Sequence, residues 1–321
     1  MRLLYATIPF ISLLIVHTQA RVVNCTSDTE IFPNGTTRSQ CYQNYLKRLV
    51  VFGDSWTENG SGPLTEASYL EDGFLGRAVN GPTWAEYLAV ENGIDLYDFA
   101  VAGATANNTN VPRGIADVQQ QVQQYLTYMG NASLPFESTL YAIWIGVNDI
   151  HDIYTNDSPD QQSEKVKIAA ESVLNAVKNL YEKSKARRFL LPTTPPIGYL
   201  PILTNGSSSA HHQPADELAK SFNHQVKQYL SNFRKENHDA EFQTFNSYNY
   251  IMSIIKDPTE YGLKYSIEPC TSTINSTVCT NSTDYLWWDG WHPTSKIQFS
   301  MIDRFIDDDF EVDIVLYTSW R

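Results

Sequence analysis

The chain has 321 residues, of which 42% are hydrophobic and 18% charged, a composition typical of a folded globular protein and not of a disordered one. A chain of this length suits one large domain or two small ones, and it buries enough surface to fold without a metal ion or a dense set of disulfides. Its 23 basic residues against 36 acidic ones leave a net charge of −13, which disfavours nucleic acid and anionic membranes as partners.

The N-terminal residues 1–20 predict a secretory signal peptide. Arg2 supplies a positive charge, residues 3–16 are mostly apolar, and Thr18-Gln19-Ala20 resembles a small-residue cleavage site. The apolar stretch is too short to span a bilayer, and no later segment reaches the roughly 18 apolar residues that a span needs. We therefore expect a secreted, extracellular protein without a membrane span, in which residues 21–321 form a single domain.

The cysteines and the glycosylation sequons agree with an extracellular location. Four cysteines allow three pairings, and their spacing favours the local disulfides Cys25–Cys41 and Cys270–Cys279 over a zinc site. Nine N-x-[ST] sequons predict N-linked glycans, although the two at Asn59 and Asn107 lie beside the motifs described below and are expected to carry none. The nine asparagines are Asn24, Asn34, Asn59, Asn107, Asn131, Asn156, Asn205, Asn275 and Asn281.

Short apolar runs that end at glycine or proline turn signals predict the strands of a sheet. They occupy residues 48–52, 94–100, 140–145 and 188–191. Two stripes of apolar residues, spaced three and four apart, predict helices over residues 166–180 and 218–233. Strands that alternate with helices are typical of a parallel sheet covered on both faces, whose functional crevice lies at the carboxyl ends of the strands.

Polar motifs follow three of these strands. Gly53-Asp54-Ser55 comes after the first, Gly103 after the second, and Gly146-Val-Asn148-Asp149 after the third. Near the C-terminus, Asp289-Gly-Trp-His292 places a carboxylate three residues before a histidine. Each motif is common by itself, since a polar turn after a strand needs no catalytic explanation. Their joint occurrence in this order, at three strand ends and near the C-terminus, is much harder to obtain by chance.

With these four motifs the sequence resembles the GDSL, or SGNH, hydrolase family over Phe52 to Pro293. The segments Gly76-Arg-Ala-Val-Asn-Gly-Pro-Thr-Trp84 and Pro192-Thr-Thr-Pro-Pro-Ile-Gly198 are similar to those of its fungal secreted branch, which includes the family 16 carbohydrate esterases, a group of acetylesterases. The resemblance implies a three-layer α/β/α sandwich with a central parallel sheet, the flavodoxin-like SGNH fold.

The chemistry assigns a role to each motif. Ser55 is a weak nucleophile unless a base removes its proton, and His292 is the expected base, oriented by Asp289. The resemblance implies that the oxyanion is held by the backbone N–H groups of Ser55 and Gly103 and by the side-chain amide of Asn148. The motif G-x-S-x-G is absent, which disfavours the α/β-hydrolase fold.

Several other residues are assigned outside this set. Asp54 is expected to hold the nucleophile loop, and His211-His212 is expected in a surface loop and not at a metal. Trp84 begins a predicted helix and is expected in the core. Trp56 follows the nucleophile and Trp291 precedes the base, so we predict that these two tryptophans form an aromatic surface for a sugar ring, with packing in the core beneath the loops as the alternative.

These observations predict a secreted, monomeric serine esterase that removes acetyl groups from carbohydrates and uses neither a cofactor nor a metal. Its substrate would be a small-molecule or oligosaccharide ester. A lipase or general carboxylesterase acting on fatty-acyl esters is an alternative, because the family shares its motifs across these substrates. A non-catalytic carbohydrate-binding glycoprotein is a further alternative, against which the complete set of five site residues argues.

Overall fold

The computed structural model describes residues 46–60, 76–129, 138–207, 210–272 and 277–306, which belong to a compact unit beginning at Leu46. The predicted signal peptide and the predicted Cys25–Cys41 disulfide lie outside these residues, as do four sequons. These four are at Asn24, Asn34, Asn131 and Asn275.

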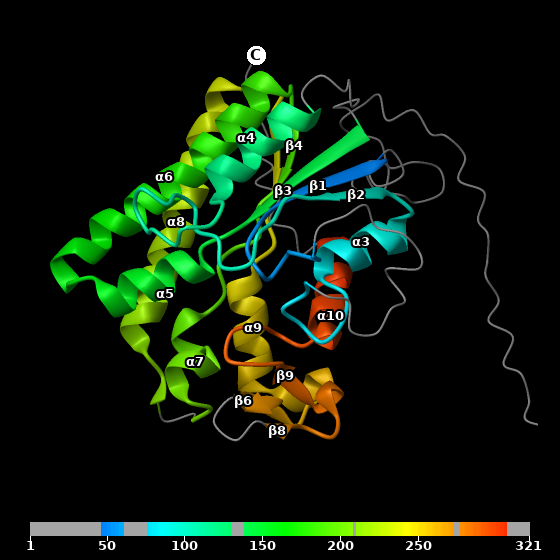
Figure 1. Cartoon of the computed structure of the whole chain (residues 1–321), viewed down its shortest axis with the longest axis vertical. Coiled ribbons are helices and arrows are strands. Elements are labelled where there is room, and N and C mark those ends of the chain that lie inside the picture. The colour runs from blue at the N-terminus through cyan, green and yellow to red at the C-terminus, as the bar shows by residue number, and fades with distance from the viewer. Residues whose placement is uncertain (1–45, 61–75, 130–137, 208–209, 273–276, 307–321) are drawn as a thin grey trace, which may run out of the picture. The chain divides into compact units, whose positions relative to one another are not determined.

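A five-stranded sheet forms the centre of the unit (Figure 1), with the strand order β2-β1-β3-β4-β5 and every neighbouring pair parallel. Its strands are β1 (Arg48–Gly53), β2 (Asp95–Asp98), β3 (Thr139–Trp144), β4 (Arg188–Leu190) and β5 (Glu241–Gln243). The four predicted strands are confirmed, and their order and direction bring the segments after β1, β2 and β3 to one edge of the sheet. The edge strand β5 was not predicted, since its three residues are only half-buried and two of them are polar.

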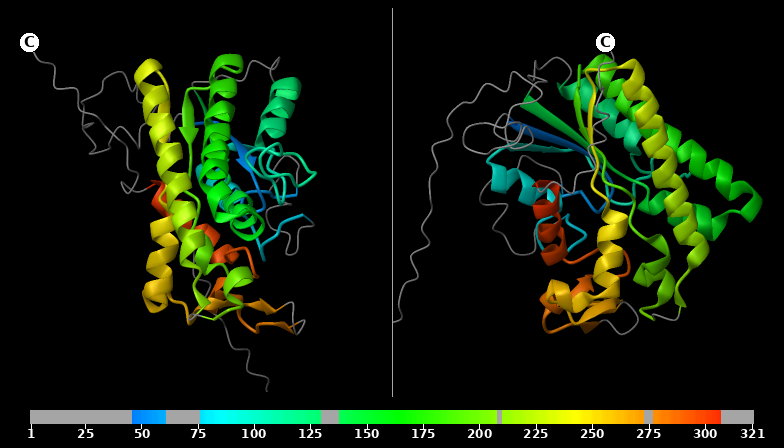
Figure 2. Two further views of the ribbon diagram at one scale, coloured as in Figure 1. Left: turned by 90° about the vertical axis from the view of Figure 1, so that its left-hand side faces the viewer. Right: turned by 180° about the vertical axis from the view of Figure 1, so that it is seen from behind.

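Helices cover both faces of the sheet, as predicted for a three-layer sandwich (Figures 1 and 2). On one side lie α4 (Val118–Met129), α6 (Pro159–Lys183) and α8 (Gln213–Glu236). On the other side lie α3 (Trp84–Asn92) and α10 (Ser295–Ile306), which pack against each other. The apolar stripes predicted for two long helices coincide with α6 and α8, and the α6 stripe is buried from Val166 to Leu180. None of the helices in the described ranges is long and apolar enough to cross a membrane.

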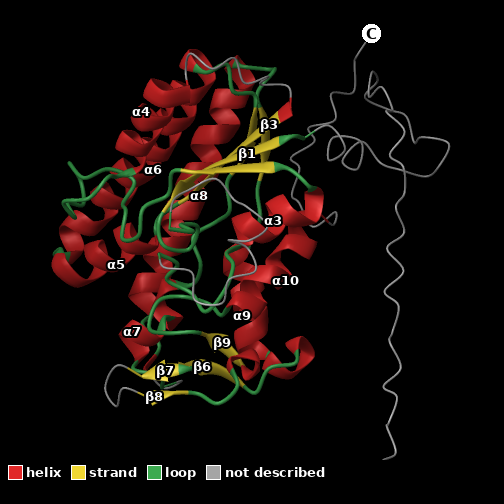
Figure 3. Cartoon of the chain, turned by 45° about the vertical axis from the view of Figure 1, so that its right-hand side comes forward, coloured by secondary structure: helices red, strands yellow, loops and turns green. Residues whose placement is uncertain are grey.

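Shorter elements lie beyond the sheet. They are α5 (Val147–Asn156), η2 (Ile197–Tyr199), α7 (Pro201–Thr204), α9 (Ser247–Lys256), η4 (Pro258–Tyr261), β6 (Tyr265–Pro269), β7 (Thr271–Ser272), β8 (Thr277–Val278), η5 (Ser282–Asp284) and β9 (Tyr285–Trp287). β6 pairs with β9 and β7 with β8 in two small sheets, which lie at the end of the molecule away from the central sheet (Figure 3). A disulfide joins Cys270 to Cys279 across the β7–β8 hairpin, which is the predicted pairing.

Four tryptophans form a cluster in the core. Each is at most 1% exposed: Trp56, Trp84, Trp144 and Trp287. Their rings pack edge to face, and the ring centre of Trp144 lies 5.4 Å from that of Trp56 and 5.7 Å from that of Trp84. Each indole N–H of the cluster donates a hydrogen bond, so burial leaves none of these polar groups unpaired. The expected core position of Trp84 is therefore confirmed.

Candidate active site

Ser55 lies in a tight turn directly after β1. Gly53 approaches the neighbouring strand so closely that a Cβ there would collide with the carbonyl oxygen of Trp144, which explains the glycine. The side-chain amide of Gln121 accepts from the N–H of Gly53 and donates to its carbonyl, both at 2.9 Å. The carbonyl of Asp54 then accepts from the N–H groups of Thr57 and Glu58, both at 3.0 Å. Ser55 is thus presented from a backbone that is held on both sides.

Ser55, His292 and Asp289 form one hydrogen-bonded chain. His292 Nε2 lies 2.7 Å from Ser55 Oγ, and His292 Nδ1 lies 2.9 Å and 3.0 Å from the two carboxylate oxygens of Asp289. Because the carboxylate accepts the Nδ1–H, Nε2 is left to accept the hydroxyl proton of Ser55. Sequence reasoning named these three residues, and the structure brings them together.

The Asp289 carboxylate also holds the loop on which it lies. It accepts from the backbone N–H groups of Trp291 at 2.7 Å and His292 at 2.8 Å. Burial opposes its charge, but the hydrogen bond and positive charge of His292 and these two N–H groups keep the pKa of Asp289 below its ordinary value. Asp289 is therefore suited to stay ionised and to stabilise a protonated His292.

The loop carrying Asp289 and His292 joins β9 to α10 and is fastened at its base. The N–H of Trp288 donates to the carbonyl of His292 at 2.8 Å, which closes the loop. From the disulfide hairpin, the N–H groups of Cys270 and Thr271 donate to the carbonyls of Trp287 and Trp288 at 3.0 Å and 2.8 Å. The hairpin therefore supports the strand from which the loop begins.

The three predicted oxyanion donors are two backbone N–H groups and one side-chain amide. Within the described residues, neither the N–H of Ser55 nor that of Gly103 donates a hydrogen bond to the protein. Gly103 has a φ of +79°, where an L side chain is strained. Asn148 is 4% exposed, and its Nδ2 donates to the carbonyl of Ala104 at 2.8 Å and lies 3.4 Å from Asp54 Oδ2. The amide of Asn148 is thus oriented by the loop that carries Gly103.

Two fully buried carboxyl groups, Asp54 and Asp149, brace these loops. Asp54 accepts from the N–H of Trp56, and Asp149 accepts from the N–H of Ala106, each at 3.0 Å. Burial raises the pKa of Asp54 to about 6 and that of Asp149 to about 7, where the nearby Asp54 charge adds to the effect. Both carboxyl groups bond to backbone, which agrees with the structural role expected for Asp54.

The two tryptophans predicted to bind a sugar ring lie in different environments. Trp56 is 1% exposed and packed among the core tryptophans, so it has no free face, and the prediction for this residue was wrong. The prediction rested only on the place of Trp56 next to Ser55, and the turn after β1 directs this side chain into the core. Trp291 is half-buried, and its ring centre lies 4.4 Å from that of His151. Of these two tryptophans, Trp291 is the one that a ligand can contact.

A polar cluster beside this site was missed by sequence reasoning. Arg113 donates two hydrogen bonds of 2.7 Å from Nε and Nη2 to the carboxylate of Asp152, which also accepts from His151 Nδ1 at 2.9 Å. Burial opposes the charge of Asp152, but these hydrogen bonds lower its pKa to about 2. Only the position of His151, three residues after Asn148 on a helix, hinted at the cluster.

The histidine pair at 211–212 is engaged with the protein. His211 Nε2 lies 2.7 Å from Asp216 Oδ2, with its ring stacked on Tyr199, and His212 Nδ1 lies 2.9 Å from the hydroxyl of Tyr154. The pair is therefore half-buried and not a free surface loop. Across the residues that the structure describes, no group of three His, Cys, Asp or Glu side chains is arranged to hold a metal ion.

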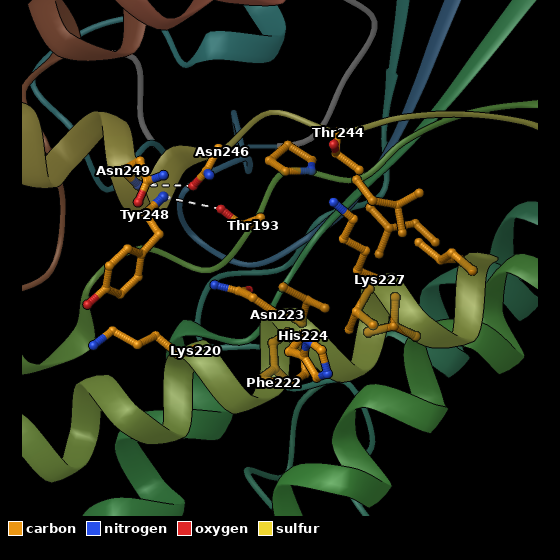
Figure 4. Close-up of a pocket in the computed structure, with 17 residues that line it drawn as sticks. Thr193, Lys220, Phe222, Asn223, His224, Lys227, Thr244, Asn246, Tyr248 and Asn249 are labelled. Atoms are coloured by element: carbon orange, nitrogen blue, oxygen red, sulfur yellow. Dashed lines mark hydrogen bonds between the residues drawn. The ribbon is translucent and has the colours of Figure 1, made fainter. Parts of the chain in front are cut away.

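A separate pocket of about 260 Å³ lies between α8 and residues 244–249 (Figure 4). Its floor is apolar, with Ile143 and Phe222, and its rim carries Lys220, His224 and Tyr248. Neither Ser55 nor any other residue of the candidate site lines it. The volume of this pocket therefore does not indicate the size of a substrate bound at Ser55.

Comparison with known proteins gives a consistent match. The family model for GDSL-like lipases and acylhydrolases matches residues 49–305. An acetylesterase of Thermothelomyces thermophilus is 28% identical over 271 residues, covering 78% of this chain and 84% of the relative. An acetylesterase of Hypocrea jecorina is 24% identical, covering 82% of this chain and 88% of the relative. A solved acetylxylan esterase variant from Geobacillus stearothermophilus aligns with a TM-score of 0.47 at 14% identity, over 80% of this chain and 91% of that one.

Proposed function

The chain belongs to the GDSL-like lipase and acylhydrolase family of serine ester hydrolases, and from this premise we propose that it is a secreted esterase that removes acetyl groups from carbohydrates. The observation that carries the proposal is the hydrogen-bonded chain from Ser55 Oγ through His292 to Asp289, with contacts of 2.7 Å and 2.9 Å. The family membership predicted from the four sequence motifs is confirmed, and the roles of the individual residues are part of the proposal.

In the first half of the reaction, Ser55 Oγ attacks the ester carbonyl while His292 Nε2 takes the hydroxyl proton. The carbonyl oxygen becomes an oxyanion, and the N–H groups of Ser55 and Gly103 and the amide of Asn148 stabilise it. The tetrahedral intermediate collapses as the bond to the alcohol breaks, and His292 gives its proton to the leaving alcohol oxygen. An acyl group is then bound to Ser55.

In the second half, a water molecule replaces the alcohol. His292 Nε2 takes one proton from the water as its oxygen attacks the acyl carbon, and the same three donors stabilise the second oxyanion. When the bond to Ser55 Oγ breaks, His292 returns the proton to that oxygen, and the carboxylic acid leaves. Asp289 stabilises the protonated imidazole in both halves and does not itself transfer a proton.

The proposed acetyl–carbohydrate substrate rests on two observations. Two fungal acetylesterases are related to this chain over most of their length, at 28% and 24% identity. The half-buried ring of Trp291 lies directly beside His292, where the alcohol part of an ester departs. A lipase remains the second candidate, because a GDSL esterase/lipase from Arabidopsis thaliana matches the same share of this chain, 78%, at 25% identity.

The proposal includes secretion and N-glycosylation. A local disulfide at Cys270–Cys279 fits an oxidising compartment. Among the described sequons, Asn156, Asn205 and Asn281 are exposed and are the proposed glycan sites. Asn59 is 4% exposed, and Asn107 is half-buried with its Nδ2 bonded to Ser172, so we expect neither to carry a glycan.

Hydrolysis of p-nitrophenyl acetate, p-nitrophenyl octanoate and acetylated xylo-oligosaccharides by purified wild type and Ser55→Ala tests the proposal. Ser231→Ala on the exposed side of α8 is the matched control. We expect Ser55→Ala to lose activity while keeping its melting temperature, and the wild type to favour acetyl over octanoyl esters. Faster cleavage of octanoyl esters, with a further rise above their micellar concentration, would favour the lipase.

A further inference from the structure

The first turns of α5 connect the candidate oxyanion site to the polar cluster described above. Asn148, His151 and Asp152 stand at positions i, i+3 and i+4, so they share one face of the helix. His151 and Asp152 therefore follow Asn148 by about one helical turn, a rise of about 5.4 Å along the helix axis. Arg113 also lies near Gly103, because its Nη1 is 3.6 Å from the position that a Cβ on Gly103 would occupy. The cluster thus lies beside two of the three proposed oxyanion donors.

Asp152 accepts hydrogen bonds from both Arg113 and His151, but it contacts only some of the nitrogen atoms of these two side chains. It accepts from Nε and Nη2 of Arg113 and from Nδ1 of His151. Within the described residues, Arg113 Nη1 and His151 Nε2 make no hydrogen bond to the protein. The side chains of Arg113 and His151 are 23% and 16% exposed, so a small molecule can reach them.

The chemistry of these two atoms matches a hydroxyl group. Arg113 Nη1 carries hydrogens and can only donate, whereas Nε2 of a neutral His151 that donates from Nδ1 can only accept. A hydroxyl group is both donor and acceptor, while a carboxylate only accepts and an alkyl chain does neither. The charges of Arg113 and Asp152 cancel, so the cluster does not favour an anion.

The cluster also contacts the loop that carries His292. His151 packs against Trp291 at 4.4 Å between ring centres, and Trp291 is adjacent to His292, which protonates the leaving oxygen in the proposed mechanism. A group held by His151 and Arg113 would therefore belong to the alcohol part of the ester. The apolar face of Trp291 would lie beside it.

We propose that Arg113 and His151, both held by Asp152, are positioning residues that bind a sugar hydroxyl next to the acetylated one and so select polyol esters over simple alkyl or aryl esters. This inference rests on the proposed function and adds to it the residues that recognise the alcohol. A purely structural role is the competing explanation, since the ion pair also fastens the loop around Arg113 to α5.

Two variants separate these explanations. His151→Phe keeps an aromatic ring against Trp291 and removes Nε2, and Arg113→Lys keeps a cation for Asp152 and removes the guanidinium Nη1. For each, kcat and KM are measured on acetylated xylo-oligosaccharides and on p-nitrophenyl acetate, whose alcohol carries no second hydroxyl. His224→Phe on the rim of the separate pocket is the control, with melting temperatures measured for all.

We expect kcat/KM on the acetylated sugar to fall about tenfold or more, chiefly through KM, with less than about a twofold change on p-nitrophenyl acetate. Equal losses on both substrates, or none on either, would overturn the inference and leave the role of Ser55 untouched. A wild type that cleaves p-nitrophenyl acetate through Ser55 but not the acetylated sugar would also overturn it. Activity retained in Ser55→Ala would instead contradict the proposed function itself.

Discussion

The indole N–H of Trp56 donates a hydrogen bond of 3.1 Å to the carbonyl oxygen of Trp291, across 235 positions of sequence. Trp56 follows Ser55 and Trp291 precedes His292, so this one bond joins the turn of the proposed nucleophile to the loop of the proposed base. Trp56, which we had expected to contact a sugar, instead joins the two loops through this hydrogen bond in the core.

Replacing Trp56 by Phe should therefore weaken catalysis more than the lost volume suggests. The ring stays in the core, but the bond to Trp291 is lost and the distance between Ser55 and His292 is less well fixed. We expect kcat to fall about tenfold with KM little changed, since geometry in the transition state is affected. Trp144→Phe is the matched control, because its N–H donates to Thr193, outside the candidate site. Similar kcat losses in both variants would point to general core damage.

Removing the Cys270–Cys279 disulfide should lower both stability and activity. Closing a loop of this size stabilises a protein by about 2–3 kcal/mol in the chain-entropy model. The hairpin donates to the carbonyls of Trp287 and Trp288, so loosening it should also disturb the loop of His292. We expect a lower melting temperature and a lower kcat for the double serine variant, measured by calorimetry and p-nitrophenyl acetate hydrolysis. An unchanged kcat would show that the loop does not depend on the hairpin.

The buried carboxyl of Asp149 should make stability depend on pH. Burial and the charge of Asp54 raise its folded pKa to about 7, above the ordinary value of 3.8 that applies when unfolded. Between these values the folded state holds a proton that the unfolded state lacks, so this contribution to stability is lost as pH rises toward 7. The Asp149→Asn variant lacks this titrating group. Between acidic and neutral pH, its free energy of unfolding should therefore fall by up to about 4 kcal/mol less than that of the wild type.

Urea denaturation of wild type and Asp149→Asn at about pH 4.5 and about pH 7.5 measures this difference. The asparagine keeps an acceptor for the N–H of Ala106, so the variant is expected to fold. Identical pH slopes for the two proteins would mean that Asp149 titrates alike in the folded and unfolded states.

Asp289→Asn should reduce turnover without affecting substrate affinity. The neutral amide cannot stabilise a protonated His292 and can favour the wrong tautomer, so we expect kcat to fall by roughly 100-fold or more at unchanged KM. The pKa of Asp289 is held below its ordinary value, so its carboxylate is charged at neutral pH, where kcat of both proteins is measured on p-nitrophenyl acetate. A variant kcat within about twofold of the wild-type value would contradict this assignment.

Local apolar patterns in the sequence predicted the buried strands and the long helices. The apolar runs that became β1 and β3 are continuous because both faces of these strands are buried, and the stripe along α6 follows from burial on one side. β5 has three residues, of which Glu241 and Gln243 are polar, so its sequence carries no strand signal. Its place at the sheet edge follows from packing and not from local preference.

The same distinction applies to the candidate site. Ser55, Gly103, Asn148 and the Asp289–His292 pair follow recognisable turns, so motifs could identify them. Arg113 and Asp152 are 39 residues apart and lie in unremarkable local sequence, and only the folded structure brings them together. The burial of Trp56 likewise depends on Trp144 of β3 and Trp287 of β9, whose rings pack against it.

Covalent labelling with a fluorophosphonate tests the central claim, that Ser55 is a nucleophile activated by His292, most directly. After brief exposure of the folded protein at neutral pH, peptide mapping by mass spectrometry locates the adduct, with His292→Ala, Ser55→Ala and Ser231→Ala treated in parallel. We predict one adduct on Ser55 in the wild type and in Ser231→Ala, much slower labelling in His292→Ala, and none in Ser55→Ala. An adduct on another residue, or labelling of Ser55 at the same rate without His292, would contradict the account.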